Sequence, residues 1–241
     1  MVGSLHLGGE CIRKPLSDAS VTFVHGILSG GERAWQHPNG ATWPQLLAQE
    51  DGLQAVGIYA FSYRSDVFCR TYNLGDVVDS LREFFHLEAL WSMGRIIFVC
   101  HSMGGIAVRR FVVVHRMDFS DRNVAIGLFL LASPSLGSKD ANALHIFARM
   151  LRNTQAEALR FSQHNTWLND LDRDFINLKE DGRLRIKGKE LIEDEPIRLK
   201  KWFGLRRQLV EPFSAARYFG ESFKVPHSDL TLARKTTADQ N

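Results

Sequence analysis

The chain has 241 residues, of which 44% are hydrophobic and 24% are charged, and its formal net charge is +3. These are ordinary values for a globular domain, and a chain of this length usually forms one domain with a sizeable core. The small positive charge gives no indication of a nucleic-acid partner. The longest apolar run, residues 124–132, is far shorter than the roughly 20 residues that span a bilayer. We therefore expect a single domain over residues 1–241.

Strands and helices are predicted to alternate along the chain. Strand-like apolar runs occur at about residues 20–25, 54–63, 95–101, 124–132, 183–192 and 206–211. Helical patterns occur at about residues 41–50, 75–91 and 104–117 and, with interruptions, at 139–178. Strands that alternate with helices are typical of a mainly parallel sheet with helices on both faces. The predicted fold class is therefore α/β.

The N-terminal segment and the cysteines bear on the cellular compartment. Residues 1–20 mix glycine with charged residues and lack the apolar core of a secretory signal. Cys11, Cys69 and Cys100 make no paired disulfide framework, which favours a reducing compartment. We therefore expect a cytoplasmic protein. Since no metal-ligand spacing and no phosphate-binding glycine loop occurs, we expect neither a metal nor a cofactor.

The most informative segment is residues 95–105, RIIFVCHSMGG. An apolar strand runs into a single serine, Ser102, and a helical segment follows, which is the context of a nucleophile elbow. The tight turn needs small residues two positions before and after the serine. Gly104 meets this need, and Cys100, which is also small, stands where the motif usually has glycine. The alternative is an ordinary turn with a serine helix cap, and we favour the elbow.

An acyl-transfer serine needs two backbone N–H groups that bind the developing oxyanion. The first comes from the residue after the nucleophile, here Met103. The second comes from a loop after an earlier strand, and the strand at 20–25 runs into His25-Gly26-Ile27. We expect the N–H of Ile27 to face the serine, with Gly26 allowing the turn and His25 shaping it rather than acting as a base.

A histidine that acts as general base should follow the serine in the chain. The candidates are His115, His145, His164 and His227. The first lies in the helix after Ser102, and the next two lie in a polar helical region typical of the surface. His227 alone follows a late strand-like segment, where an imidazole could reach the serine. The alternative for His227 is an exposed loop residue, and we favour catalysis.

The acid of the triad should end the strand between the serine and the histidine. The predicted strand at 183–192 runs into Glu193, Asp194 and Glu195. Glu193 directly follows an apolar pair, so it is the best placed of the three to be partly buried and to face a histidine. Asp194 and Glu195 are more typical of solvated loop charges. The sequence favours Glu193 and leaves the other acids open.

Several segments carry a resemblance to a known family. They are VTFVHGILSGGERAWQ, ATWPQLLA, IIFVCHSMGGIAVRR, LFLLASPSLGS, ELIEDEP, LVEPFSAA and VPHSDLTLA. With these segments, the chain from about residue 20 to about 235 resembles the serine-active-site-containing and GPI-inositol-deacylase-like branch of the α/β-hydrolases, which borders bacterial lipases. Ser133-Pro134-Ser135 departs from the Thr-Pro-His that the family often has at this place.

The resemblance implies an α/β-hydrolase fold with a Ser102, His227 and Glu193 triad and the oxyanion turn after the first matched strand. It also implies that residues 136–179 carry a helical lid or cap. The alternative is simple packing onto the sheet, which we expect for most apolar residues of this segment, while a minority could line an acyl pocket. Some members of this family are N-terminal effector domains of signalling proteins, and the chain stops without a closing helix pattern. We therefore also expect that the chain is a module of a longer protein.

The segment at residues 198–207 interleaves basic residues with Trp202 and Phe203. We expect it to form the turn between the last two strands. It could contact a membrane peripherally through these aromatic residues, but the reading we favour is a solvated hairpin whose aromatic rings pack back on the domain.

Two functions follow from the sequence. The first is a serine esterase or lipase that cleaves a small-molecule or lipid ester, with a lipid-like acyl group as the leading substrate class. The second is a non-catalytic or regulatory α/β-hydrolase module that serves as the effector domain of a larger signalling assembly. The intact Ser102 and the late His227 favour the first.

Overall fold

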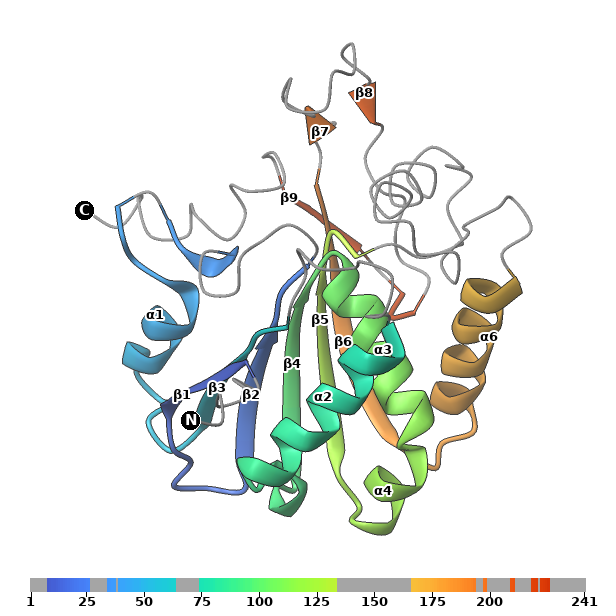
Figure 1. Cartoon of the computed structure of the whole chain (residues 1–241), viewed down its shortest axis with the longest axis horizontal. Helices are drawn as coiled ribbons and strands as arrows, with labels where there is room; N and C mark the ends of the chain where they lie inside the picture. Colours follow the sequence, from blue (N-terminus) through green and yellow to red (C-terminus); the bar gives the residue numbers. More distant parts are fainter. Residues whose placement is uncertain are drawn as a thin grey trace, which may run out of the picture.

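The computed structural model of the chain describes residues 8–26, 34–37, 39–63, 74–133, 166–193, 197–198, 209–210, 218–220 and 222–225. Its centre is a seven-stranded sheet with the order β1-β3-β2-β4-β5-β6-β9 (Figure 1). The strands are β1 (Gly9–Arg13), β2 (Ala19–Val24), β3 (Gly57–Phe61), β4 (Arg95–His101), β5 (Ala125–Leu131), β6 (Arg185–Glu193) and β9 (Ser222–Val225). All neighbouring strands run parallel except β1, which pairs antiparallel with β3.

Helices cover both faces of the sheet. They are α1 (Trp43–Gln49), α2 (Leu74–Leu87), the 3-10 helix η2 (Leu90–Ser92), α3 (Met103–Val114), α4 (Arg116–Asp121) and α6 (Thr166–Glu180). Figure 1 shows α2, α3, α4 and α6 on one face of the sheet and α1 beside β1 and β3. Two apolar clusters separate these layers, a large one under α2, α3 and α6 and a smaller one around Phe23, Trp35 and Trp43. The apolar residues of α1 pack on the second of these clusters. The expected α/β architecture is confirmed.

Most predicted elements are confirmed within a few residues. The strands expected at 20–25, 54–63, 95–101, 124–132 and 183–192 correspond to β2, β3, β4, β5 and β6. The apolar stripe of α2 is buried as its periodicity predicts, through Val77, Val78, Leu81, Phe84 and Phe85. The late strand-like segment before His227 is β9. The sequence did not predict β1, because this short strand at the sheet edge is half exposed and has no clear apolar pattern.

The last predicted strand does not belong to the main sheet. Residues 206–211 were expected to form the last strand, but β8 (Leu209–Val210) pairs only with β7 (Ile197–Arg198), in a separate two-stranded antiparallel sheet. The last two strands of the main sheet are β6 and β9. Residues 199–208 therefore join β7 to β8 within the long connection from β6 to β9, and these residues, which include Trp202 and Phe203, lie outside the described residues.

Part of the expected lid region at 136–179 is described. Residues 166–180 form α6, and its Leu171, Phe175 and Leu178 are buried in the large core cluster. This helix therefore packs onto the domain beside α3, and the rest of the expected lid lies outside the described residues. None of the helices in the described ranges is long and apolar enough to span a membrane.

Candidate active site

The parallel strands bring distant residues to one edge of the sheet. Val24 at the end of β2 is in register with Cys100 of β4, and Cys100 is in register with Leu130 of β5. The carboxyl ends of these strands therefore align, and the residues that follow them meet there. In open parallel sheets this edge is where ligands bind.

Ser102 lies at this edge, between β4 and α3, in a strained conformation. Its backbone has φ 53° and ψ −121°, a region that residues other than glycine rarely adopt. The turn is held because the N–H of Ser102 donates to Leu131 O at 2.9 Å and the N–H of Gly105 donates to Ser102 O at 3.1 Å. The Ser102 side chain is partly exposed and makes no helix-capping hydrogen bond. Its hydroxyl is therefore not used as the cap that the alternative interpretation requires.

Glycines allow the close packing around this serine. A Cβ on Gly104 would collide with Val24 O and lie 2.6 Å from His25 O, so only glycine lets α3 begin this close to β2. A Cβ on Gly26 would lie 2.8 Å from the Cβ of Ser102 and 3.2 Å from its Oγ. The turn after β2 is therefore in direct contact with Ser102.

Cys100, two positions before Ser102, is a buried cysteine. Its side chain is completely buried in the large core cluster. Burial strongly raises the pKa of its thiol, which keeps the sulfur protonated and a poor nucleophile. Cys100 therefore acts here as a small core residue.

His25 is fixed by both ring nitrogens. Its Nε2 accepts the N–H of Tyr63 at 3.1 Å, so the proton is on Nδ1, which donates to Gly26 O at 2.7 Å. The ring stacks on Tyr63, with 4.3 Å between the ring centroids, and the Tyr63 hydroxyl donates to His25 O at 2.9 Å. Burial lowers the pKa of His25. A neutral imidazole with both nitrogens engaged holds the turn and is not free to accept a proton.

His101 directly precedes the serine and is also held neutral. Desolvation, with a smaller contribution from His25, lowers the pKa of His101 to about 4. Its ring meets Trp35 edge to face, with 6.4 Å between the centroids. The edge around Ser102 therefore carries two uncharged imidazoles, whose proton uptake becomes important only in acid.

The structure brings some of the predicted site residues together. Met103 is the buried first residue of α3, directly after Ser102. Glu193 is the last residue of β6 and is in register with Val225 at the end of β9. Its backbone therefore lies at the same sheet edge, two strands from the one that carries Ser102. Ile27, His227, Asp194 and Glu195 lie outside the described residues.

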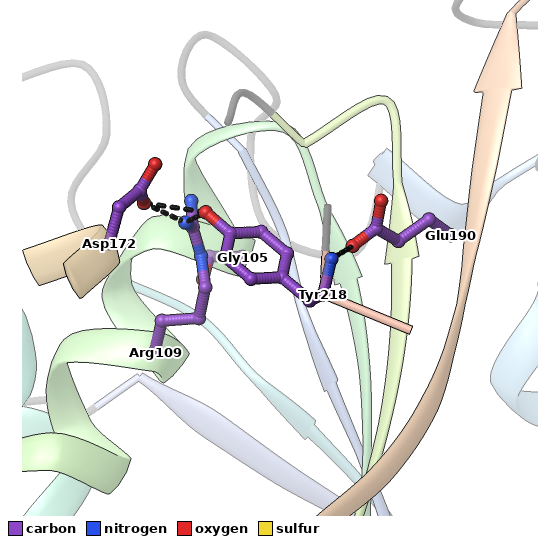
Figure 2. Close-up of polar contacts among 5 residues, drawn as sticks. All are labelled: Gly105, Arg109, Asp172, Glu190 and Tyr218. Atoms are coloured by element: carbon purple, nitrogen blue, oxygen red, sulfur yellow. Dashed lines mark hydrogen bonds and ion pairs between the residues drawn. The ribbon is translucent and has the colours of Figure 1, made fainter. Parts of the chain in front are cut away.

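A buried polar cluster near this edge was not predicted from the sequence (Figure 2). Arg109 of α3 and Asp172 of α6 form an ion pair at 2.5 Å, and their side chains are 0% and 1% exposed. The Tyr218 hydroxyl donates to the same oxygen of Asp172 at 2.5 Å and accepts a hydrogen bond from Arg109. The backbone N–H of Tyr218 donates to Glu190 of β6 at 3.0 Å.

One sequence signal points to this cluster. Arg109 lies four residues after Gly105 on the apolar face of α3, where a charged residue is unexpected unless it is paired. The other residues of the cluster come from three other parts of the chain, so no local pattern reveals them. Within the described residues, no group of three or more His, Cys, Asp or Glu side chains could hold a metal ion.

Comparison with known proteins identifies the family. The sequence model of the alpha/beta hydrolase family matches residues 23–233, which is most of the chain. The chain belongs to the alpha/beta hydrolase family. The matched range contains the strained Ser102, the turn after β2 and the strands that end at their edge, and it agrees with the observed parallel sheet. A comparison with curated proteins finds no match.

Solved structures resemble this alpha/beta hydrolase in fold. A chain from the metagenome-derived lipolytic enzymes LipS and LipT has a TM-score of 0.54 at 10% identity, over 96% of this chain and 92% of that one. The propeptide form of lipase BlEst2 from Bacillus licheniformis has a TM-score of 0.50 at 14% identity, over 96% of this chain and 51% of that one. At these identities the likeness shows the fold, and it does not single out the GPI-inositol-deacylase-like branch.

Proposed function

We propose that this alpha/beta hydrolase is a serine hydrolase that cleaves carboxylic esters. The observation that carries the proposal is Ser102, a partly exposed serine whose backbone is strained and whose hydroxyl does not cap the helix that follows. Strain of this kind persists only where the surrounding structure enforces it, and it occurs mostly at functional sites. A strand–serine–helix turn at the carboxyl edge of a parallel sheet is the arrangement of a nucleophile elbow.

The reaction would proceed in two steps. Ser102 Oγ attacks the ester carbonyl carbon while His227 takes the hydroxyl proton, and the carbonyl π electrons move onto oxygen. When the tetrahedral intermediate collapses, the bond to the alkoxy oxygen breaks and His227 returns the proton to the leaving alcohol. Water then repeats the sequence on the acyl-serine, with His227 again as base. Glu193 would orient the imidazole and stabilise its positive charge.

The position of Ser102 supports an oxyanion site formed by backbone N–H groups. The N–H of Met103 belongs to the first turn of α3, where amide groups have no partner inside the helix and the helix dipole favours negative charge. The contact between Gly26 and Ser102 brings the chain after β2 to the same point. Ile27, the next residue, would supply the second N–H.

Two of the described histidines, His25 and His115, are poorly placed to act as the general base. Both nitrogens of His25 are engaged. His115 is at the C-terminal end of α3, about 20 Å along the helix from Ser102 at its N-terminal end. The parallel strand β9 ends at Val225, on the sheet edge that Ser102 occupies, and His227 follows two residues later. These placements favour His227.

The substrate we propose is an ester with a lipid-like acyl group, bound without a cofactor. The structural relatives with the higher TM-scores are lipolytic enzymes and a lipase, which supports this substrate class. The acyl and alcohol groups can be compared directly with a series of p-nitrophenyl esters from acetate to palmitate.

The decisive experiment uses a fluorophosphonate probe, which reacts covalently with activated serines. The parent protein should be labelled on the peptide that contains Ser102, and Ser102→Ala should lose the label. Ester turnover should fall by about 10⁴-fold or more in this variant, while its circular dichroism stays that of the parent.

A matched control is Ser120→Ala on α4, a serine far from the proposed site. It should keep both the label and the turnover. Equal labelling of the parent and Ser102→Ala would overturn the proposed mechanism and would favour the non-catalytic module instead.

A further inference from the structure

The cluster formed by Arg109, Asp172, Tyr218 and Glu190, here called the Arg109 cluster, joins four separate parts of the fold. Arg109 belongs to α3, Asp172 to α6 and Glu190 to β6, while Tyr218 lies shortly before β9 (Figure 2). All four residues are at most 6% exposed. The Arg109 guanidinium also lies over the Tyr218 ring, 4.7 Å from its centroid.

A buried charged cluster is an expensive way to hold a core together. Removing a guanidinium and carboxylates from water costs several kcal/mol for each ion, and apolar residues of similar size often stabilise a fold as well. What such a cluster adds is geometry, because each donor must face its acceptor and only one arrangement satisfies them all. The Arg109 cluster therefore fixes the relative positions of α3, α6, β6 and the segment before β9.

One end of the cluster is bound to the turn that carries Ser102. The Arg109 Nε donates to Gly105 O at 3.1 Å, and the N–H of Gly105 donates to Ser102 O at 3.1 Å. The guanidinium is thus linked through the first turn of α3 to the proposed nucleophile.

The other end of the cluster is bound to β6 and α6 close to the start of β9. Tyr218 is bound to β6 through Glu190, and its carbonyl oxygen also accepts a hydrogen bond from Lys179 of α6. Glu190 is itself in register with Ser222, the first residue of β9. From there the parallel pairing continues to Glu193 and Val225, two residues before His227.

We propose that the Arg109 cluster is a positioning device that sets β9, and with it His227, at the working distance from Ser102. This inference rests on the proposed serine-hydrolase function and extends it. Tyr218 is the central positioning residue, because its hydroxyl joins Arg109 to Asp172 while its backbone N–H joins both to β6. It does not itself touch the reacting atoms.

The test variant is Tyr218→Phe, which removes the hydroxyl and keeps both the ring and the backbone bond to Glu190. A misplacement of about 1 Å at a catalytic group can cost about 100-fold in rate. We therefore expect kcat to fall by about 10- to 100-fold with KM unchanged within about threefold, since the ester would still bind. Fluorophosphonate labelling of Ser102 should slow by a similar factor.

Hydrogen exchange gives a second readout that does not depend on activity. In Tyr218→Phe, the backbone amides of Ser222–Val225 should exchange faster than in the parent, while those of β4 keep their protection. A loss spread evenly over the molecule would be the sign of general destabilisation.

The matched control is Val124→Ala, which truncates a buried side chain just before β5, at the sheet edge opposite Ser102. It should lower thermal stability and leave kcat, labelling and β9 exchange as in the parent, with all assays run well below the lowest melting temperature. This separates positioning from a mere loss of stability.

The outcomes are distinguishable. If the parent is labelled at Ser102 and Tyr218→Phe matches it in kcat and labelling rate, or if β9 exchange does not change, the positioning role is overturned while the proposed function stands. If Ser102 in the parent is not labelled, the proposed function fails and this inference fails with it.

Discussion

At the scale of single residues, the site depends on a few small and strained positions. Ser102 adopts its rare backbone conformation because Leu131 binds its N–H and because Gly26 and Gly104 leave no side chain in its way. His25 and His101 are imidazoles kept neutral by burial. The chemistry proposed for the site therefore needs a third imidazole and a carboxylate that orients it.

The acid can be identified by three separate substitutions. A triad carboxylate holds the tautomer of the histidine and stabilises its positive charge, so an amide of the same shape should fail. Glu193 ends β6 next to the end of β9, the strand that leads to His227. Glu193→Gln should therefore lower ester turnover by about 10²- to 10⁴-fold with little change in melting temperature.

The two neighbouring acids are the controls. Asp194→Asn and Glu195→Gln should each stay within about tenfold of the parent, because solvated charges interact weakly with a distant site. A large loss in either one would move the triad acid along the chain by one or two positions. If none of the three matters, the acid comes from another strand end, for which Asp140 is the next candidate.

At the scale of elements, most of the fold could be predicted because the sheet is buried on both faces. The strands β2 and β4 are largely apolar runs with several β-branched residues, and β5 is an apolar run rich in leucine, which is the pattern of central parallel strands. The strand β1 gives no such signal. The Arg13 side chain at its end donates to the carbonyl oxygens of Val56 and Ala48, at 3.0 and 2.6 Å, so long-range bonds accompany its pairing.

The difference between local sequence patterns and long-range contacts also explains which parts of the site could be predicted. Ser102 is marked by a local sequence motif, whereas the Arg109 cluster depends on residues far apart in the chain. Arg109 and Asp172 are 63 positions apart, and Arg109 and Tyr218 are 109 apart. Charged residues are rarely buried unless they are paired, so a pattern that places Arg109 on an apolar helix face predicts a partner without naming it.

The pairing of α3 with α6 gives a prediction about stability. Asp172→Leu would leave the Arg109 guanidinium buried without its carboxylate, and breaking a buried pair in this way typically costs about 3–5 kcal/mol. The triple variant Arg109→Met, Asp172→Leu and Tyr218→Phe removes the polar partners together. It should recover most of the lost free energy of unfolding in urea denaturation.

An exposed ion pair on the same helix provides the control. Asp170 and Arg173 of α6 lie 3.0 Å apart, with side chains 49% and 65% exposed. Asp170→Leu should change the free energy of unfolding by less than about 1 kcal/mol. A cost for Asp172→Leu as small as that for Asp170→Leu would mean that the buried pair does not hold α6 to α3.

At the scale of the whole molecule, the order of the strands brings together the strand ends that carry the proposed site residues. Ser102, Glu193 and the residue that follows β9 are far apart in the sequence, and the parallel sheet brings their strand ends to one edge. The helices α2, α3, α4 and α6 bury one face of this sheet, so the position of each strand end depends on the whole core. Acid conditions should therefore affect the stability of the fold through the groups buried at this edge.

The stability of the molecule should fall as the pH is lowered toward 5. Burial lowers the pKa of His101 from 6.5 to about 4, and it also lowers that of His25. Because the folded-state pKa lies below that of the unfolded chain, the unfolded chain binds more protons between about pH 4 and 6.5. The contribution of these neutral imidazoles to the free energy of unfolding is therefore fully present above pH 6.5 and is lost as the pH falls through this range.

The variant His101→Gln isolates one of these groups. Since His101 as a whole residue keeps some contact with solvent, which weakens the effect of desolvation, we expect the parent to lose only about 1 kcal/mol more than His101→Gln between pH 7 and pH 5, measured by urea denaturation at each pH. His86→Gln, which replaces an exposed histidine of α2, should keep the pH dependence of the parent. If His101→Gln loses as much stability as the parent over the same range, His101 does not take up its proton on unfolding, and the acid sensitivity of the fold originates elsewhere.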